Sequence, residues 1–353
     1  MQPFNHDYLL IGQGLAGTLL AHFLEKAGKS VFVIGQQNEH AASSVAAGII
    51  NPITGRRYVK SWQVDRLIPF ARDTYRELEQ QFHISIYHQR NILRALFNAK
   101  EENDWLARSG EEDYGSYMLD RADLDGYAGK IERAFGYGEV QYSAQVDIGL
   151  LVQAFRSYLE NKGAYREEPF DHAQLKVREQ GVAYKGIKAG AIVFCEGRWA
   201  KENPFFNYLP FHGDKGEVLI VRIPDAAFEK ILKQQIFIVP LQNGLYWIGS
   251  NYVKNPEDDE PTEAGAEYLR SQLERILKTP FEAVEHRAAI RPTVKDRRPF
   301  LGRHPEFPEL ALFNGLGTKG ASLGPYWAKH MADHLVNNVT LEEAVDIKRF
   351  VKK

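Results

Sequence analysis

Residues 7–17 read DYLLIGQGLAG, and this stretch decides the fold. Its apolar start predicts a short buried strand, and residues 18–27, which carry leucines on one face, predict a helix. Between the two, Gly12, Gly14 and Gly17 follow the spacing G-x-G-x-x-G. Here the first glycine permits a tight turn, the second lets a pyrophosphate approach the backbone, and the third lets the helix pack closely on the strand. The stretch therefore predicts a dinucleotide site at the N-terminus of the helix.

The next apolar run, residues 30–34, predicts a second strand and completes a strand–helix–strand unit. A glycine-rich turn in some other α/β fold is the alternative interpretation. The acidic residue that usually ends the second strand and binds the adenosine ribose is missing, because Gly35 and Gln36 stand there. Gln36 can still hydrogen-bond a hydroxyl group. The motif alone does not choose among FAD, NAD and NADP.

The composition predicts two domains, possibly interleaved, and no general attraction to anionic partners. The chain has 353 residues, 44% of them apolar, so it can bury a sizeable core. Its net charge of −2 makes nucleic acid an unlikely partner. No run approaches the ~20 apolar residues of a membrane helix, and we expect no signal peptide at the N-terminus. The one cysteine, Cys195, excludes a disulfide or a cysteine-based metal site within the chain, which favours a cytoplasmic location and predicts no metal.

A second glycine-rich turn lies near the C-terminus, between a predicted strand at 310–314 and a predicted helix at 325–337. It contains Gly315, Gly317, Gly320 and Gly324. Backbone N–H groups at a helix N-terminus can meet an electron-rich ligand edge, which in a flavoenzyme would be the pyrimidine end of the ring system. The nearby Lys319 would then favour the reduced flavin. Taken alone, the turn is better interpreted as an ordinary glycine-rich connection between a strand and a helix.

Two further segments have features of a ligand site. Residues 41–48 are small and would let the backbone approach a flat ligand closely. The following loop carries Arg56, Arg57 and Lys60, which either face a ligand or form a solvated basic loop.

With these stretches together, the sequence resembles the D-amino acid oxidase-like family of FAD-dependent oxidoreductases, which includes glycine, sarcosine and D-amino acid oxidases. The similar stretches follow the order of the family along nearly the whole chain. They are DYLLIGQGLAG, SSVAAGIINP, QVDIGLLVQAF, AIVFCEGRWA, KGEVLIV, FIVPLQNGLYWIGSNY, AAIRPTVKDRRPFLG and NGLGTKGASLGPYWAKHMADHL.

The resemblance implies an α/β fold, in which a Rossmann-type FAD-binding domain is interleaved with a substrate domain built mostly of antiparallel sheet. The FAD-binding domain would comprise residues 1–82, 139–205 and 286–353. The substrate domain would comprise residues 83–138 and 206–285.

The resemblance also implies non-covalent FAD and a set of residues around it. The predicted cofactor residues are Gly12, Gly14, Leu15, Ala16, Gly17, Gln36, Ser43, Ser44, Gly48, Phe170, Glu196, Gly197, Gly315, Gly317, Thr318, Lys319, Gly320 and Ala321. For Glu196, which has apolar neighbours, a bond to a loop backbone and a place near the cofactor both stay open.

On the substrate side, the resemblance implies that Arg291 binds a carboxylate, with Tyr252 and Tyr246 beside it. A guanidinium fork suits a planar carboxylate. A structural ion pair of Arg291 with Asp296 or another acid is the alternative. Phe237 and Trp247 complete a predicted aromatic wall. Strand alternation puts Tyr246 and Trp247 on opposite faces, so they cannot all point into one site.

The implied chemistry is oxidation of a C–N bond in an amino acid or secondary amine. Hydride would pass to flavin N5 and leave an imine that water hydrolyses, with oxygen or an unknown carrier as the final electron acceptor. Three alternatives remain. The chain could remove a carboxymethyl group from a modified tRNA wobble uridine, serve as a non-catalytic FAD-binding subunit, or be a nicotinamide dehydrogenase, for which the second glycine turn would have no role.

Overall fold

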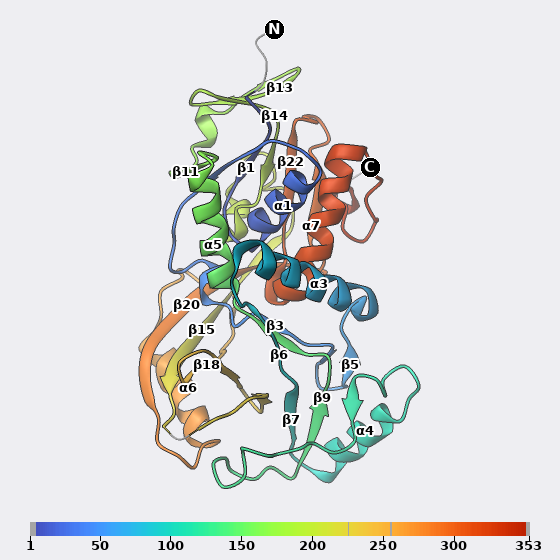
Figure 1. Cartoon of the computed structure of the whole chain (residues 1–353), viewed down its shortest axis with the longest axis vertical. Coiled ribbons are helices and arrows are strands. Elements are labelled where there is room, and N and C mark those ends of the chain that lie inside the picture. Colours follow the sequence, from blue (N-terminus) through green and yellow to red (C-terminus); the bar gives the residue numbers. More distant parts are fainter. Residues whose placement is uncertain (1–4, 225, 255, 351–353) are drawn as a thin grey trace.

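The computed structural model describes residues 5–224, 226–254 and 256–350. They form two units, each built on a large sheet, which lie one above the other in Figure 1. The upper sheet has eight strands and the lower sheet has nine.

The upper sheet has the strand order of a Rossmann-type domain. Its parallel core runs β11-β2-β1-β14-β22, so the strands follow the spatial order 3-2-1-4-5. The predicted fold class is confirmed. The strands of this sheet are β1 (His6–Ile11), β2 (Val31–Gly35), β11 (Tyr165–Glu167), β12 (Lys176–Arg178), β13 (Gly181–Tyr184), β14 (Ile187–Phe194), β21 (Phe300–Arg303) and β22 (Leu310–Asn314).

Alternating apolar side chains bury both faces of this sheet. In β1, Tyr8 and Leu10 belong to the core on the helical side, whereas Leu9 and Ile11 belong to the core on the opposite side. Four helices cover the helical side in Figure 1. They are α1 (Leu15–Lys26), α3 (Val64–Phe82), α5 (Ile148–Asn161) and α7 (Gly320–Asn337).

Helix α7 begins five residues earlier than the sequence predicts and continues through Pro325. Proline has no N–H to donate to the carbonyl four residues before it, which here belongs to Ala321. The hydroxyl of Tyr75, on α3, donates to that carbonyl at 2.9 Å instead. A side chain from another helix thus replaces the missing backbone bond, and sequence periodicity alone gives no sign of this.

The lower sheet is mostly antiparallel, and its order is β19-β15-β18-β17-β16-β7-β9-β8, with β20 on β15. Helix α6 (Glu263–Glu274) covers one face, which we call the outer face. The inner face packs against the segment around Val45 and Ala47. The strands are β7 (Ile92–Leu96), β8 (Met118–Leu119), β9 (Gly136–Val140), β15 (Phe211–Arg222), β16 (Ile231–Lys233), β17 (Phe237–Pro240), β18 (Leu245–Gly249), β19 (Val253–Lys254) and β20 (Glu282–Val294).

Further elements lie outside the two large sheets and the helices named above. They are α2 (Ala42–Val45), α4 (Ala99–Ser109), the small sheet of β3 (Ile49–Ile50), β10 (Ala144–Val146) and β6 (Tyr87–Gln89), the hairpin of β4 (Ile53–Thr54) and β5 (Val59–Lys60), and the 3-10 turns η1 (His172–Gln174), η2 (Gly197–Lys201), η3 (Gly317–Lys319) and η4 (Ile347–Phe350). The predicted domain boundaries stay predictions. Two of them, after residues 138 and 285, fall inside β9 and β20, so a division by sheets moves them.

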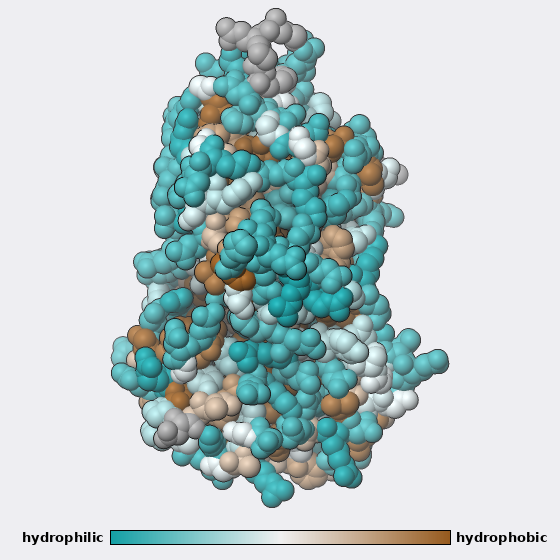
Figure 2. Space-filling model, in the orientation of Figure 1, coloured by the Kyte–Doolittle hydropathy of each residue, from teal (hydrophilic) through white to brown (hydrophobic). Residues whose placement is uncertain are grey.

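Figure 2 shows a face on which hydrophilic side chains predominate and hydrophobic ones lie in small separate groups. Within the described residues, no helix combines the length and the apolar character that crossing a membrane requires.

A glycine in β9 provides a test of the inner-face packing. A Cβ on Gly138 would lie 2.0 Å from the ring of Trp105, which is fully buried. We therefore expect Gly138→Ala to lower the free energy of unfolding by about 1–3 kcal/mol, because the ring has to move. Gly110→Ala is the matched control, since its φ is −76° and its Cβ would meet nothing closer than 3.6 Å. Equal urea denaturation midpoints for the two variants would contradict this packing.

Candidate active site

The first glycine turn packs against the turn that follows β14. Gly12 has a φ of +100°, and a Cβ there would lie 2.4 Å from the carbonyl oxygen of Cys195. A Cβ on Gly17 would lie 1.9 Å from the carbonyl oxygen of Gly12. Both approaches are closer than any side chain permits. The two turns therefore hold their backbones at one edge of the sheet, where parallel strands end and nucleotides bind in such folds.

The small-residue segment reaches the N-terminus of α1. The Oγ of Ser43, in α2, accepts a hydrogen bond from the backbone N–H of Leu15 at 2.9 Å, and it lies 3.0 Å from where a Cβ on Gly14 would be. Ala16 follows in the first turn of α1. Ser44 is exposed and donates to the carbonyl of Asn38 instead. Of the two predicted serines, the structure places Ser43 at the helix N-terminus.

Gly48 brings the same segment against β10. Its φ is +70°, and a Cβ there would lie 1.8 Å from the carbonyl oxygen of Val146. The backbone of the segment is thus held close to β10 on one side.

The second glycine turn meets the first. Gly315 and Gly317 have φ values of +79° and +57°, and a Cβ on Gly320 would lie 3.2 Å from the side chain of Leu15. The two predicted turns, some three hundred positions apart in the chain, thus lie side by side (Figure 1). Thr318 is exposed beside them. Ala321 is buried, and its carbonyl is the one that Tyr75 binds.

Lys319 extends from the second turn toward the β4–β5 hairpin. Its Nζ lies 3.2 Å from the Oγ of Ser61 and 3.5 Å from the Oγ1 of Thr54. Burial, with the charges of Arg297 and Arg298, lowers the pKa of Lys319. Three cations therefore lie near the edge where the predicted flavin site is.

The carboxylate of Glu196 bonds two side chains, and its place near the cofactor stays a prediction. Its Oε1 lies 2.9 Å from the Nε2 of His172, and its Oε2 accepts from the Nδ2 of Asn203 at 2.7 Å. The adjacent Gly197 accepts a hydrogen bond from Asn314, at the end of β22, which joins the ends of two parallel strands. Glu196 thus braces the loop behind the first glycine turn.

Phe170 lies in the core on the side of the sheet away from the helices. Its ring stacks on Tyr184 with the centroids 4.4 Å apart and meets Phe194 edge to face. The ring fills this core, which leaves the backbone of Phe170 as the part that could meet a cofactor.

The side chain of Tyr165, in β11, lies beside Gly35, where the ribose-binding acid usually stands. A Cβ on Gly35 would lie 2.9 Å from the side chain of Gln13 and 3.2 Å from the hydroxyl oxygen of Tyr165. That hydroxyl is buried and has no hydrogen-bond partner among the described residues. Gln36, the residue predicted for this role, is exposed. A side chain at position 35 would therefore press on Gln13 and Tyr165, and there is little room here for the usual acid.

Arg291, in β20, lies across the inner face of the lower sheet. A Cβ on Gly216 would lie 1.7 Å from its Nη2, and that nitrogen donates to the Oγ of Ser250 at 2.7 Å. Its Nη1 is buried without a partner in the described chain. Burial lowers the pKa of the guanidinium, which is the cost of holding a cation here. The glycine makes room for the fork, and one half of the fork remains free.

The predicted alternative partner of Arg291 is bound elsewhere. Asp296 pairs with Arg349 at 2.9 Å. Arg291 forms no ion pair within the described residues, although Asp214 faces it across the strand pair and acts on it at longer range. Tyr252 is 54% exposed, and its hydroxyl bonds Asp214, which places it at the rim beside Arg291.

Tyr246 does not reach this site, contrary to the prediction. Its side chain is buried in the core beneath α6, where its hydroxyl donates to the carbonyl of Ala226 and accepts from the N–H of Phe228. Trp247 has the opposite orientation and donates to the carbonyl of Val45 at 2.8 Å. The alternation of the strand decides between the two.

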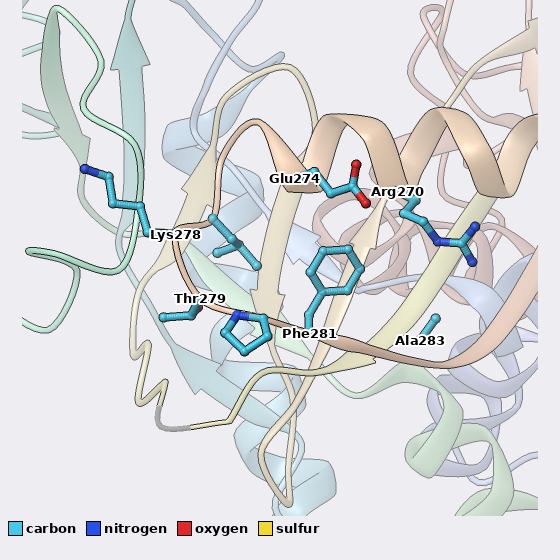
Figure 3. Close-up of a pocket in the computed structure, with 8 residues that line it drawn as sticks. Arg270, Glu274, Lys278, Thr279, Phe281 and Ala283 are labelled. Carbon is cyan, nitrogen blue, oxygen red and sulfur yellow. The ribbon is translucent and has the colours of Figure 1, made fainter.

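Two hollows lie outside the space between the sheets. A groove of about 470 Å³ lies where α6 ends and the chain turns into β20, and Figure 3 shows the ring of Phe281 in the centre of the view, beside Glu274. It contains neither glycine turn nor Arg291, so we do not assign the active site to it. A second hollow of about 250 Å³ borders Gly197 and the outer side of β20 at Ile290.

The residues that sequence reasoning missed are those that hold others in place. Gln13 is buried, accepts from Arg156 and donates to the carbonyl of Val152. Gly216 and Ser250 position Arg291. One sequence signal could have found one of them. The period-2 alternation of a strand puts Gly216 and Val218 of KGEV on one face.

A Rossmann-type sheet, two glycine turns at its edge and an arginine on the facing sheet fit a flavin-dependent oxidoreductase. The family model described as FAD dependent oxidoreductase (DAO) matches residues 7–334, and the chain belongs to this family. FAD is therefore its cofactor.

Similar proteins support this assignment. The chain is 24% identical to a glycine oxidase of Bacillus licheniformis over 99% of this chain and 98% of that protein. It is 26% identical to the bifunctional protein ThiO/ThiG of a Nostoc species, over 94% of this chain but only 52% of that longer protein. The solved glycine oxidase from Bacillus cereus has the same fold, with a TM-score of 0.80 and 22% identity over 95% of this chain and 96% of that one.

The residues present fit FAD. Gly12 and Gly14 have no side chains, the N-cap residue of α1 gives no side-chain cap, and the hydroxyl of Tyr165 beside Gly35 has no partner in the described chain. We infer that these groups hold the cofactor.

The approach of Gly17 to Gly12 provides a test of this site. We expect Gly17→Ala to weaken FAD binding by at least about tenfold, or ~1.4 kcal/mol, because the new Cβ displaces the turn that receives the pyrophosphate. FAD bound per chain after gel filtration, and a fluorescence titration of the apoprotein, measure the effect. Gly149→Ala, in the first turn of α5 with nothing closer than 3.7 Å, should leave binding unchanged. Full FAD occupancy in Gly17→Ala would contradict the assignment.

Proposed function

We propose that the chain oxidises the C–N bond of an amino acid or secondary amine whose carboxylate binds Arg291. Oxidation of amines or amino acids in general follows from the family and its glycine oxidase relatives. The observation that carries the finer assignment is the buried Nη1 of Arg291, which has no partner in the described chain. A carboxylate is the group that a guanidinium fork binds in two parallel hydrogen bonds.

The residues of the chain orient the substrate. Gly216 leaves the space for the guanidinium, Ser250 fixes one of its nitrogens, and the other is left for the substrate. A charge-assisted contact of this kind contributes roughly 1.5–3 kcal/mol. Tyr252, at the exposed rim, is placed to cover the bound substrate.

When bound, FAD supplies the redox chemistry by accepting a hydride from the carbon next to the substrate nitrogen. The chain then has to position that carbon and need not supply a base. Lys319, together with the N-terminus of α7, places positive charge where a reduced flavin would carry negative charge. Oxygen or another electron carrier as acceptor, and a cytoplasmic location, stay predictions.

Anaerobic reduction tests the proposal. Purified protein loaded with FAD should lose its visible flavin absorption when amino acids or N-alkyl glycines are added without oxygen. A protein that holds FAD but is reduced by no amine would instead be a binding subunit, and reduction only by a modified tRNA would move it to the RNA-directed alternative.

A substitution then tests the role of Arg291. We expect Arg291→Met to raise KM for a carboxylate substrate by at least about tenfold with unchanged FAD content, because the lost contact is to substrate and not to cofactor. Arg222→Met, at the exposed end of β15, is the matched control. Unchanged steady-state kinetics in Arg291→Met would reject the assigned role.

A further inference from the structure

Two further cations, Arg94 and Lys233, lie on the same inner face as Arg291. Strand pairing aligns Arg94 of β7 with Lys233 of β16, Lys233 with Phe237 of β17, and Phe237 with Gly249 of β18. Residues aligned in this way across a sheet project from the same face. Gly249 precedes Ser250, whose hydroxyl binds Arg291. The row thus leads from the predicted carboxylate site to two further positive side chains.

Neither cation is neutralised by the protein. Within the described residues, Arg94 and Lys233 form no ion pair with a carboxylate. The Nζ of Lys233 donates to the carbonyl of Gln235 at 2.8 Å and lies 4.4 Å from the centre of the Phe237 ring. The guanidinium of Arg94 lies 5.7 Å from the centre of the Tyr58 ring. Both side chains are only partly exposed, so the fold keeps two like charges side by side in a shielded place.

The pKa of Lys233 reflects these surroundings. Burial and the neighbouring charge of Arg94 lower the pKa of Lys233 to about 8. Glu101 acts on Arg94 at longer range, but its carboxylate accepts from the backbone N–H of Phe97. An anion between the two cations would remove their repulsion, and nothing in the described chain supplies one.

The separation from Arg291 suits a small molecule. The guanidinium of Arg291 lies over Gly216 in β15, and the Nζ of Lys233 lies over the ring of Phe237 in β17. These two strands are separated only by β18. Gly216 lies two residues before Val218, which aligns with Gly249 and through it with Phe237. At about 4.8 Å between neighbouring strands and about 3.4 Å per residue along a strand, the two positive centres are roughly 12 Å apart. The ring of Trp247 lies over Gly249, 2.8 Å from where a Cβ would be, so a ligand that reaches both positive centres would lie against this ring.

We propose that Lys233 and Arg94 form a subsite for a second anionic group of the substrate, so that the preferred substrate is an amino acid or N-substituted amino acid with an additional carboxylate. This rests on the proposed function, in which Arg291 takes the first carboxylate. The aromatic rings of Phe237 and Tyr58 flank the subsite and would exclude water from the contact. Within the described chain the partners of these cations are aromatic rings, a backbone carbonyl and the more distant Glu101, so an anionic group of a ligand would be the first to pair with them directly.

Ligand binding tests the subsite without turnover. FAD-loaded protein is titrated with succinate, glutarate and adipate, and separately with butyrate, while the visible flavin spectrum is followed. At pH 7 we expect the best dicarboxylate to bind at least about tenfold more tightly than butyrate. Equal affinities for all four acids would overturn the proposal, and this comparison needs no variant.

Variants then assign the effect to residues. Lys233→Met and Arg94→Met should each remove most of the dicarboxylate advantage and leave the butyrate affinity unchanged. Lys278→Met, an exposed lysine beyond α6, should leave both affinities unchanged. Equal losses for dicarboxylate and butyrate in the two subsite variants would indicate a general structural effect and would reject the subsite.

Paired substrates separate this proposal from the proposed function. Aspartate and asparagine, glutamate and glutamine, each in both configurations, and N-(carboxymethyl)glycine and N-methylglycine are compared in anaerobic flavin reduction. The subsite predicts a lower KM for at least one anionic member of these pairs. Reduction by neutral members alone would reject the subsite and keep the proposed function. If no member reduces the flavin, the proposed function fails, and the dicarboxylate titration still decides the subsite.

Discussion

The contact on which the rest of the structure depends is the approach of one backbone turn to another at the edge of the upper sheet. Gly17 lies against the carbonyl of Gly12, and Gly12 lies against the carbonyl of Cys195, at distances that no Cβ permits. This contact sets α1 on the sheet, and α1 in turn carries Leu15, against which the distant Gly320 packs. Two segments at opposite ends of the chain thereby form one surface for a cofactor.

A second constraint is the distribution of charge around that surface. The chain as a whole is slightly acidic, yet Arg291, Lys319, Lys233 and Arg94 are all held in shielded places facing the region between the sheets. Holding cations out of water costs free energy, and none of these four forms an ion pair with a carboxylate within the described residues. A ligand that brings negative charge offsets this free-energy cost, and both a flavin and an anionic substrate carry such charge.

The sequence predicted what depends on local pattern and missed what depends on contacts between distant segments. The glycine spacing and the apolar runs predicted the first strand–helix–strand unit. Both the conformation of a turn and the burial pattern of a strand or helix depend on a few neighbouring residues. The hydroxyl of Tyr165 beside Gly35, and that of Tyr75 on the carbonyl of Ala321, involve strands and helices far apart in the chain. No local signal marks them.

The same distinction explains the substrate side. Arg291 stood out through its resemblance to a family motif, and the structure adds the reason that it can lie there, which is the missing side chain at Gly216. Tyr246 and Trp247 are neighbours in sequence, and choosing between them required knowing which face of β18 is covered by α6. Lys233 and Arg94 became a pair only through the parallel alignment of β16 with β7, which sequence alone does not reveal.

The most direct test of the account is a crystal structure of the FAD-bound protein with glutarate. The account predicts FAD along both glycine turns, one carboxylate on the Nη1 side of Arg291, and the other carboxylate between Lys233 and Arg94. Glutarate bound in the groove beneath α6, or Arg291 turned away to pair with Asp214, would contradict it.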